Sequence, residues 1–175
     1  MDILNKKHFL TVKDYSVSKE IFDLYYDEKL DMLITHPQPS LENLGKYYES
    51  VDYISHTDSK RSLFEKAYHF VKNIALKNKL NLINDEQSQK GRILDIGAGT
   101  GDFLLTAKND GWDTVGVEPS ERAKNIAIQK GISFVNEISD LENNSFDVIT
   151  MWHVLEHVPN LELQIEELKR LLKPT

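Results

Sequence analysis

The stretch Arg92 to Phe103, RILDIGAGTGDF, places three glycines within five residues directly behind an apolar run. Gly97, Gly99 and Gly101 can adopt positive φ and lack a Cβ, so the backbone can turn sharply and approach a ligand closely. A dinucleotide fingerprint has the spacing G-x-G-x-x-G, whose last glycine helps to receive a pyrophosphate at a helix N-terminus. Here the spacing is G-x-G-x-G and the next residue is Asp102, an acid that disfavours a pyrophosphate there. The loop therefore predicts a ligand without phosphates.

Two further acids accompany this loop. Asp95 lies at the tip of the apolar run, and Glu118 ends a second run, 21 residues after Gly97. Glu118 can accept hydrogen bonds from the 2′- and 3′-hydroxyls of a ribose, and Asp95 can accept from a cationic or amino group. A ribose, an amino group and no pyrophosphate describe a nucleoside amino acid. The alternatives are structural: a tight turn for the glycines, a helix cap or loop acid for Asp95, and a solvated strand end for Glu118.

A second segment that can do chemistry is MWHVLEHVPN, which follows another apolar run. His153 and His157 are its candidate bases at neutral pH, and a base is needed only if the reacting group must lose a proton. As alternatives, His157 fixes the segment through a loop-to-helix hydrogen bond, and His153 is a partly buried polar residue that packs the site. Trp152 either walls a pocket or fills the core.

The elements that must position these residues follow from the pattern after Arg92. The strand-like runs RILDI, DTVGVE, ISFV and FDVITMW alternate with the helical runs GDFLLTAKNDG, SERAKNIAIQKG and LELQIEELKRLL. Strands alternating with helices of about 10–15 residues imply a parallel sheet with helices on both faces. We expect a doubly wound α/β fold, preceded by an amphipathic helix at about 62–80 and a polar loop at 84–91. Ligands of such sheets bind at the carboxyl ends of the strands.

The segments RILDIGAGTGDF, VGVEPS, SFDVITMWHVLEHV and ELKRLLKP resemble the successive motifs of class I S-adenosylmethionine-dependent methyltransferases. The resemblance covers about Arg92 to Pro174 and implies a Rossmann-like sheet with strand order 3-2-1-4. It implies S-adenosyl-L-methionine as cofactor and S-adenosyl-L-homocysteine as product. The methionine moiety would lie near Asp95 and the glycines and the ribose near Glu118, while VNEISDL offers Glu137 or Asp140 for the adenine. The expected cofactor-binding residues are Asp95, Gly97, Ala98, Gly99, Gly101, Glu118, Pro119, Glu137, Trp152, Tyr48 and Tyr53.

The resemblance favours a methyltransferase that acts on a small-molecule acceptor. His157 matches the histidine of the family's leHv pattern, which implies acceptor orientation or proton removal; His153 is the second catalytic candidate. The DPPY and NPPY signatures of amino-methyltransferases acting on adenine or glutamine are absent, and no cysteine offers the covalent route to C5 of cytosine. A non-catalytic SAM-binding or interaction domain stays open. A NAD-dependent oxidoreductase is more remote, because the G-x-G-x-G spacing opposes it.

Residues 1–60 lack the regular alternation of strand-like and helical runs seen after Arg92, and they contain the segments THPQPS and YYESVDYISH. We expect an α-rich N-terminal arm, followed by the Rossmann-like SAM-binding domain at residues 61–175. Related methyltransferases often fold an aromatic N-terminal segment over the cofactor, so Tyr48 and Tyr53 predict a lid; ordinary packing against the sheet is the alternative. The arm also resembles that of bacterial members with a Cys-x-x-Cys motif, but without cysteines a metal site is not carried over, and no metal is expected.

The composition indicates the class of partner. The chain has 175 residues, a formal net charge of −7 and no cysteine. Nucleic-acid-binding surfaces are usually basic, so no nucleic-acid partner is expected. No apolar run approaches the roughly 18–20 residues of a membrane span, and the first ten residues lack the apolar core of a signal peptide. Together with the absence of cysteine, this favours a cytoplasmic protein with no membrane partner.

The sequence ends at LLKPT, where the family usually continues KPGG into a fifth strand of a sheet ordered 3-2-1-4-5-7-6. We therefore expect a domain truncated at its C-terminus, with a complete cofactor half and an acceptor pocket that is largely absent. The alternative is a minimal domain whose sheet edge is covered by residues 1–60 or by another chain. An unpaired strand edge favours pairing, so a homodimer through this edge is an expected partner arrangement.

Overall fold

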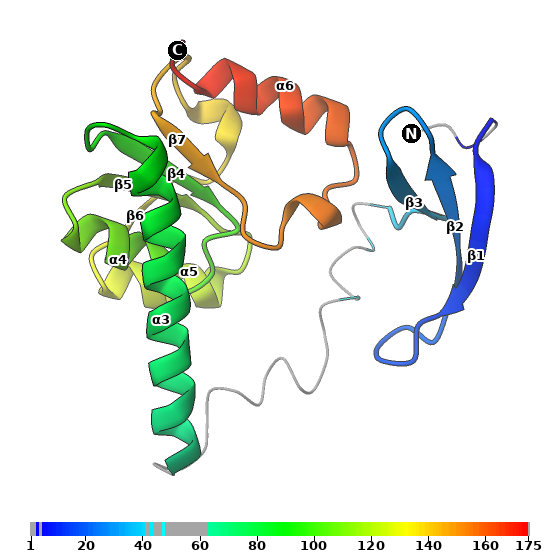
Figure 1. The fold of residues 1–175 in the computed structure, drawn as a ribbon, viewed down its shortest axis with the longest axis horizontal. Helices are drawn as coiled ribbons and strands as arrows, with labels where there is room; N and C mark the ends of the chain where they lie inside the picture. The colour runs from blue at the N-terminus through cyan, green and yellow to red at the C-terminus, as the bar shows by residue number, and fades with distance from the viewer. Residues whose placement is uncertain (1–2, 4, 41–42, 44–46, 48–62, 175) are drawn as a thin grey trace. The chain divides into compact units, whose positions relative to one another are not determined.

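The computed structural model describes residues 3, 5–40, 43, 47 and 63–174 (Figure 1). The chain divides into two compact units, Met1–Lys60 and Arg61–Thr175, and each is considered by itself. Tyr48 and Tyr53, the aromatic residues expected in a lid, lie outside the described residues. Their role therefore stays a prediction.

Residues 7–36 of the N-terminal unit form a three-stranded antiparallel sheet, so strands occupy this part of the arm that was expected to be α-rich. Strands β1 (Lys7–Lys13), β2 (Ile21–Asp27) and β3 (Met32–His36) lie in that order, with β2 in the middle (Figure 1). The β-branched and aromatic side chains of KHFLTVK and IFDLYYD favour extended backbone over helix. Asp14 closes the β1–β2 turn by accepting hydrogen bonds from the backbone N–H groups that follow it.

The C-terminal unit is an α/β domain built on a parallel sheet of order β6-β5-β4-β7, which confirms the predicted 3-2-1-4 arrangement. Its elements are α3 (Leu63–Glu86), β4 (Arg92–Ile96), α4 (Asp102–Asn109), β5 (Asp113–Val117), α5 (Glu121–Gln129), β6 (Ser133–Phe134), η2 (Ile138–Asp140), β7 (Val148–Thr150), η3 (Leu155–His157) and α6 (Leu161–Leu171). Helix α3 continues beyond its predicted end near residue 80, because Leu80 and Ile83 extend its buried face.

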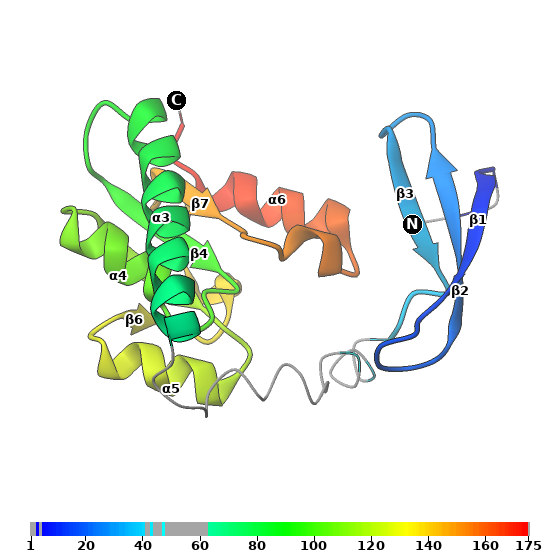
Figure 2. The same ribbon diagram turned by 60° about the horizontal axis from the view of Figure 1, so that its bottom comes forward.

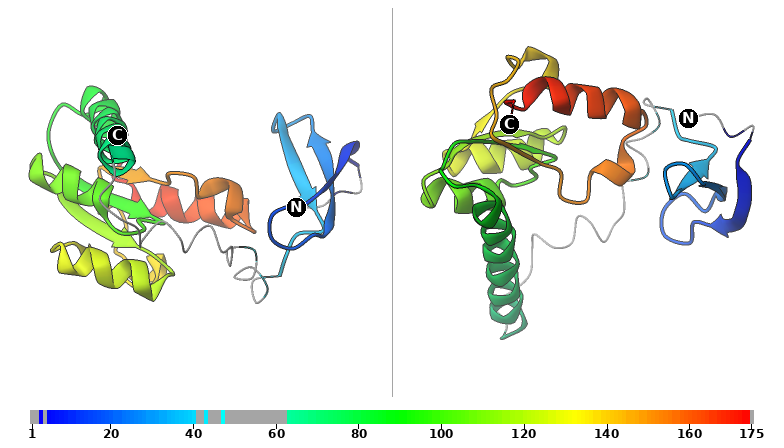
Figure 3. Two further views of the ribbon diagram at one scale, coloured as in Figure 1. Left: turned by 90° about the horizontal axis from the view of Figure 1, so that it is seen from below. Right: turned by 45° about the horizontal axis from the view of Figure 1, so that its top comes forward.

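Alternate residues of β4 face two hydrophobic layers. Ile93 belongs to a buried cluster formed with residues of α3, α4 and α5, whereas Leu94 and Ile96 belong to a second cluster that contains Leu171 of α6. Helices α3, α4 and α5 therefore cover one face of the sheet and α6 covers the other, as Figures 2 and 3 show for α3 and α6. Because side chains alternate along a strand, Asp95 shares the face of Ile93 and lies on the α3 side.

Candidate functional site

The glycine loop joins β4 to α4 and is held to the end of β5. The N–H groups of Gly97 and Ala98 donate to the carbonyl oxygen of Val117, with N···O distances of 2.8 and 3.1 Å. Gly97, Gly99 and Gly101 have φ values of +74°, +54° and +72°, in the left-handed region that glycine adopts at little cost. The loop thus lies at the carboxyl ends of β4 and β5, where ligands of such sheets bind.

The three loop glycines differ in what a Cβ atom would meet. At Gly97 it would lie 2.4 Å from Cγ2 of Val154, and at Gly101 it would lie 2.7 Å from Cβ of Ala127 in α5. At Gly99 it would meet no atom within 4 Å. Gly97 and Gly101 are therefore needed for packing inside the domain, a role that their spacing alone does not indicate. Gly99 borders open space that a ligand can enter.

Glu118 follows β5 and links the glycine loop to the start of α5. Its Oε2 accepts a hydrogen bond from the N–H of Gly99 at 2.8 Å, and its Oε1 accepts from the N–H of Ser120 at 2.9 Å. Each carboxylate oxygen has a further lone pair for another donor. Glu118 is thus fixed in orientation and keeps acceptor capacity beside the opening at Gly99, which fits a ribose with two hydroxyls. Pro119 lies between Glu118 and Ser120, the N-cap of α5.

Asp95 is a buried acid at the carboxyl end of β4. The residue is 3% exposed, and its Oδ1 accepts a hydrogen bond from Oγ1 of Thr150, its partner across the β4–β7 pair, at 2.6 Å. Burial raises the pKa of Asp95 to about 7, although Thr150 and Lys79 act in the opposite direction. The helix-cap alternative is wrong, because α4 starts after Gly101 without a side-chain cap. A buried carboxyl with unused acceptor capacity suits a cationic ligand group.

Trp152 packs the α3 side of the sheet and also lines a cavity. Its ring meets Phe103 edge to face at 5.6 Å between centroids, and Nζ of Lys79 lies 4.5 Å from its ring centroid. The indole Nε1 is buried and has no hydrogen-bond partner among the residues that the structure describes. The two alternatives for Trp152, pocket wall and core residue, therefore apply together.

Asp102, the first residue of α4, is paired with two lysines. Lys72 of α3 and Lys130 donate to its carboxylate at 2.7 and 2.8 Å, and the Thr100 hydroxyl donates at 2.8 Å. Burial acts to raise the pKa of Asp102, but the hydrogen bonds from Lys130 and Lys72 lower it to about 2. Because its charge is compensated, Asp102 opposes a pyrophosphate less than the sequence suggests. The argument for a phosphate-free ligand therefore depends on the glycine spacing and on Glu118.

The two candidate bases follow β7 on the surface. His153 has φ +60°, an 89% exposed side chain, and a distance of 3.8 Å between its Nδ1 and Oε1 of Glu156. The alternative of a partly buried His153 is therefore wrong. His157 ends η3 with its backbone N–H donating to the Val154 carbonyl at 2.9 Å, and its side chain is exposed. A catalytic role for either histidine stays a prediction.

The acids considered for the adenine lie just beyond β6. Glu137 precedes η2 and Asp140 ends it, and both are exposed. Nothing in their hydrogen bonding separates the two, so the assignment of Glu137 stays a prediction. Within the described ranges, no cluster of three or more His, Asp or Glu residues has the geometry to hold a metal ion. The helices described there include none with the length and apolar character needed to cross a bilayer.

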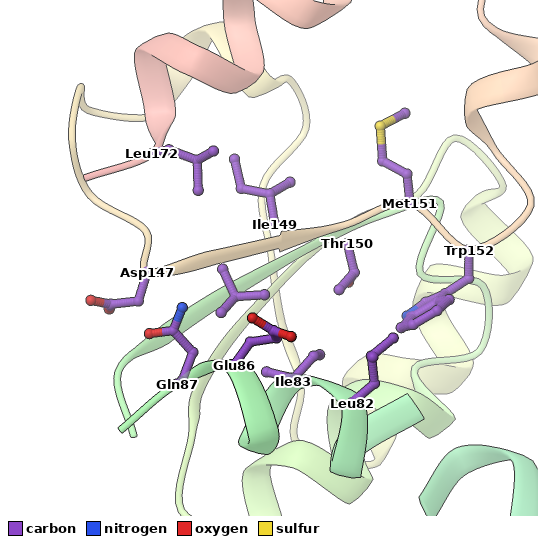
Figure 4. A pocket seen from close by; sticks show the side chains of 11 residues that line it. Leu82, Ile83, Glu86, Gln87, Asp147, Ile149, Thr150, Met151, Trp152 and Leu172 are labelled. Carbon is purple, nitrogen blue, oxygen red and sulfur yellow. The ribbon is translucent and has the colours of Figure 1, made fainter. Parts of the chain in front are cut away.

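A cavity of about 440 Å³ lies along the outer edge of β7. Figure 4 shows that side chains of α3, β7 and Leu172 converge on it, with Trp152 beside Leu82. Among the described strands, β4 pairs with one edge of β7 and none pairs with the other edge. A parallel bridge between Phe146 and Leu172 closes that edge only ahead of β7. The cavity thus follows an unpaired strand edge.

Residues 63–175 match the model of a family described as "Methyltransferase domain", which is more than half of the chain. The chain belongs to this methyltransferase family. The match confirms the class I S-adenosylmethionine-dependent methyltransferase inferred from the motifs, together with its Rossmann-like fold and its cofactor, S-adenosyl-L-methionine. The glycine loop and Glu118 described above fit that cofactor.

Individual relatives support the same fold. The chain is 30% identical over 107 residues to the ubiquinone biosynthesis O-methyltransferase of Hahella chejuensis, covering 55% of this chain and 45% of that protein. The PH0226 protein of Pyrococcus horikoshii OT3 superposes with a TM-score of 0.54 at 23% identity, covering 73% of this chain and 57% of that one. The plantazolicin methyltransferase BpumL, solved with SAH, gives 0.50 at 22% identity, covering 59% and 43%. The methyltransferase chain spans about half the length of the curated relatives it matches.

Proposed function

We propose that this methyltransferase binds S-adenosyl-L-methionine at its glycine loop and transfers the methyl group to a small-molecule acceptor. The observation that carries the proposal is the arrangement around Glu118. Its carboxylate is oriented by the N–H groups of Gly99 and Ser120 and lies beside the one loop glycine whose Cβ position is open. Buried Asp95 supplies a second acceptor on the neighbouring strand.

Each expected cofactor residue has a proposed role. Glu118 accepts the ribose hydroxyls, Asp95 accepts the ammonium group of the methionine moiety, and the backbone at Gly99 lies against the ligand. Gly97 and Gly101 hold the loop in shape through their close packing. The remaining proposed contacts come from Ala98, Pro119, Glu137, Trp152, Tyr48 and Tyr53.

The bound cofactor supplies a methyl group on a sulfonium, which is already a good leaving group. The task left to the chain is to hold the acceptor in line and to exclude water. His157 or His153 would take a proton if the acceptor is a hydroxyl, as the name of the O-methyltransferase relatives favours. A base of this kind typically contributes about 10²–10⁴-fold to the rate.

Isothermal titration with S-adenosylhomocysteine tests the proposal, with NAD as the matched control nucleotide. We expect saturable binding of S-adenosylhomocysteine and no heat from NAD. The opposite pattern would support the oxidoreductase alternative, and folded protein that binds neither would overturn the proposal. Turnover of labelled S-adenosylmethionine is then measured on a panel of hydroxyl acceptors. Binding without turnover on any acceptor would favour a non-catalytic SAM-binding domain.

We further propose that the unpaired edge of β7 forms a homodimer contact. No described strand pairs with the outer edge of the three-residue strand β7, and Leu82 on the adjoining helix is both exposed and part of the cavity wall. Light scattering after size exclusion should show a dimer that becomes monomeric in Leu82→Glu. A wild-type protein that is monomeric at about 100 μM would contradict this arrangement, because a Kd above that concentration corresponds to less than about 5.5 kcal/mol of association free energy.

Two proposals concern the whole chain. We propose that Tyr48 and Tyr53 contact the cofactor, as the lid predicted from the sequence requires, and that the protein acts in the cytoplasm. Replacing Tyr48 and Tyr53 together by alanine should weaken S-adenosylhomocysteine binding about tenfold, because aromatic contacts of this kind contribute about 0.5–1.5 kcal/mol beyond area burial. Unchanged affinity would leave the two tyrosines without a lid role. Cell fractionation tests the location.

A further inference from the structure

Lys79 of α3 is half-buried and takes part in none of the ion pairs among the described residues of the domain. Lys72 of α3 and Lys130 both pair with Asp102. Lys79 has neither a hydrogen bond nor an ion pair among the described residues. Its Nζ lies over the Trp152 ring, 4.5 Å from the centroid. A lysine in this position loses hydration without gaining a carboxylate partner.

Asp95 presents the complementary charge on the same face of the sheet. It lies on the α3 side of β4, and Lys79 is close enough to act electrostatically on its carboxyl group. The two side chains nevertheless form no ion pair within 4 Å. Burial lowers the pKa of Lys79 and raises that of Asp95, so each charge is less stable than it would be in water. An acid and a base on facing elements are thus left unbridged.

A zwitterion satisfies both groups at once. The ammonium of an α-amino acid would interact with Asp95, and its carboxylate would interact with Lys79, restoring a partner to each desolvated charge. Trp152 holds the Lys79 ammonium through its ring face, and Phe103 supports that ring from the first turn of α4. The lysine is therefore pre-positioned at the end of the sheet where the glycine loop lies.

We propose that Lys79 is the residue that receives the carboxylate of the cofactor's methionine moiety, opposite Asp95. This inference rests on the proposed function, because it assigns one end of the same ligand. It makes Lys79 a cofactor-binding residue that discriminates ligands with an amino-acid tail from nucleosides that lack one.

The test compares two ligands on three proteins by isothermal titration. S-adenosylhomocysteine has the amino-acid tail, whereas 5′-methylthioadenosine keeps the adenosine and the sulfur but lacks the carboxylate and the ammonium. Wild type is compared with Lys79→Met, which keeps an apolar contact with Trp152, and with Lys77→Met, which removes an exposed lysine two residues away on the same helix.

We expect Lys79→Met to weaken S-adenosylhomocysteine binding about 30-fold, because the variant loses a charge-assisted hydrogen bond to the ligand carboxylate. Binding of 5′-methylthioadenosine should change less than twofold, and Lys77→Met should leave both affinities unchanged. Equal weakening of both ligands, or no weakening of either, would overturn the role of Lys79. If wild type binds neither ligand, the proposed function itself fails.

A second variant keeps the test decisive if Lys79→Met does not fold, which thermal melting will show. Lys79→Arg retains the cation and its contact with the Trp152 ring, and it should retain the preference for S-adenosylhomocysteine over 5′-methylthioadenosine within about threefold. Loss of that preference in a folded arginine variant would contradict the proposal.

Discussion

The glycine loop after β4 and the segment after β7 both carry candidate functional residues, but the two regions differ in how their residues are positioned. The loop is hydrogen-bonded to the neighbouring strand through Gly97 and Ala98, and Gly99 donates to Glu118. The segment after β7 presents His153 with an 89% exposed side chain. Backbone hydrogen bonds to the end of β5 position the loop, whereas the His153 side chain extends into solvent.

This difference separates two kinds of functional residue. The groups that we propose bind the cofactor are fixed by hydrogen bonds at the strand ends, and pre-organisation of this kind strengthens binding. Groups that would face the acceptor depend on whatever else covers them. Cofactor binding should therefore respond strongly to substitutions in the first region and weakly to substitutions in the second.

The largest expected effect is at Glu118. Glu118→Ala removes both proposed ribose bonds and the acceptor of the Gly99 N–H, so S-adenosylhomocysteine affinity should fall more than about 100-fold. Glu121→Ala is the matched control, because that carboxylate is 76% exposed at the start of α5. Titration calorimetry measures both. An unchanged affinity in Glu118→Ala would remove the ribose assignment.

Two glycine variants sharpen the comparison within the loop. Gly101→Ala places a Cβ 2.7 Å from Ala127 at positive φ, so it should destabilise the fold by about 2–3 kcal/mol. Gly99→Ala has open space around its Cβ and should cost only about 1 kcal/mol of backbone strain, while it obstructs the ligand. Urea unfolding should show the larger loss of stability in Gly101→Ala, whereas titration should show the larger loss of S-adenosylhomocysteine affinity in Gly99→Ala. Identical rankings would contradict the division of roles.

Asp95→Asn should raise the stability of the ligand-free protein at pH 8 and lower its affinity for the cofactor. The pKa of Asp95 is raised from its ordinary value near 4 to about 7, so the folded ligand-free protein holds this proton more tightly than the unfolded chain. Its stabilising contribution is present below pH 4 and is lost as the pH rises to about 7. Asparagine keeps an acceptor for Thr150 without the charge. We expect its melting temperature at pH 8 to exceed that of wild type by about 3 °C, with little gain at pH 4.

The same variant should bind S-adenosylhomocysteine about tenfold more weakly at pH 8, because the ammonium loses its charged partner. Differential scanning calorimetry across pH 4–8 checks the stability, and titration at pH 8 checks the affinity. A lower melting temperature for Asp95→Asn at pH 8 would show that the ionised carboxylate is better satisfied than its burial indicates.

The smallest effect is expected at the exposed histidine. His153→Ala should change cofactor affinity less than twofold and stability by less than about 0.5 kcal/mol, as is usual for surface substitutions. If the acceptor is a hydroxyl and His153 is the base, the same variant lowers turnover without changing cofactor binding. A large loss of cofactor affinity would show that the two regions are more tightly connected than their contacts indicate.

The parallel sheet, and the position of the glycine loop and Glu118 at the ends of its strands, could be predicted from the sequence because short stretches of sequence indicate them. Strands and helices alternate at characteristic spacings, and the loop glycines and Glu118 follow strand ends directly. The N-terminal strands were not predicted. Strand β1 is exposed along its whole length, so its sequence has no alternation of buried and exposed residues that would indicate a strand. Lys79 is hidden for a related reason: on an amphipathic, lysine-rich helix it has the pattern of a solvated face, and only the fold brings it to Trp152.

The packing of Val154 against Gly97 has a mechanical consequence. A methyl group of Val154 occupies the place where any other residue at position 97 would carry its Cβ, so the two segments are in van der Waals contact. Val154 is also the residue immediately after His153 and three residues before His157. A displacement of the loop toward Val154 would therefore press on the histidine segment, and the contact between Phe103 and Trp152 joins the same two regions. The glycine loop and the histidine segment are thus coupled by packing, so a side chain added at position 97 would displace residues in both.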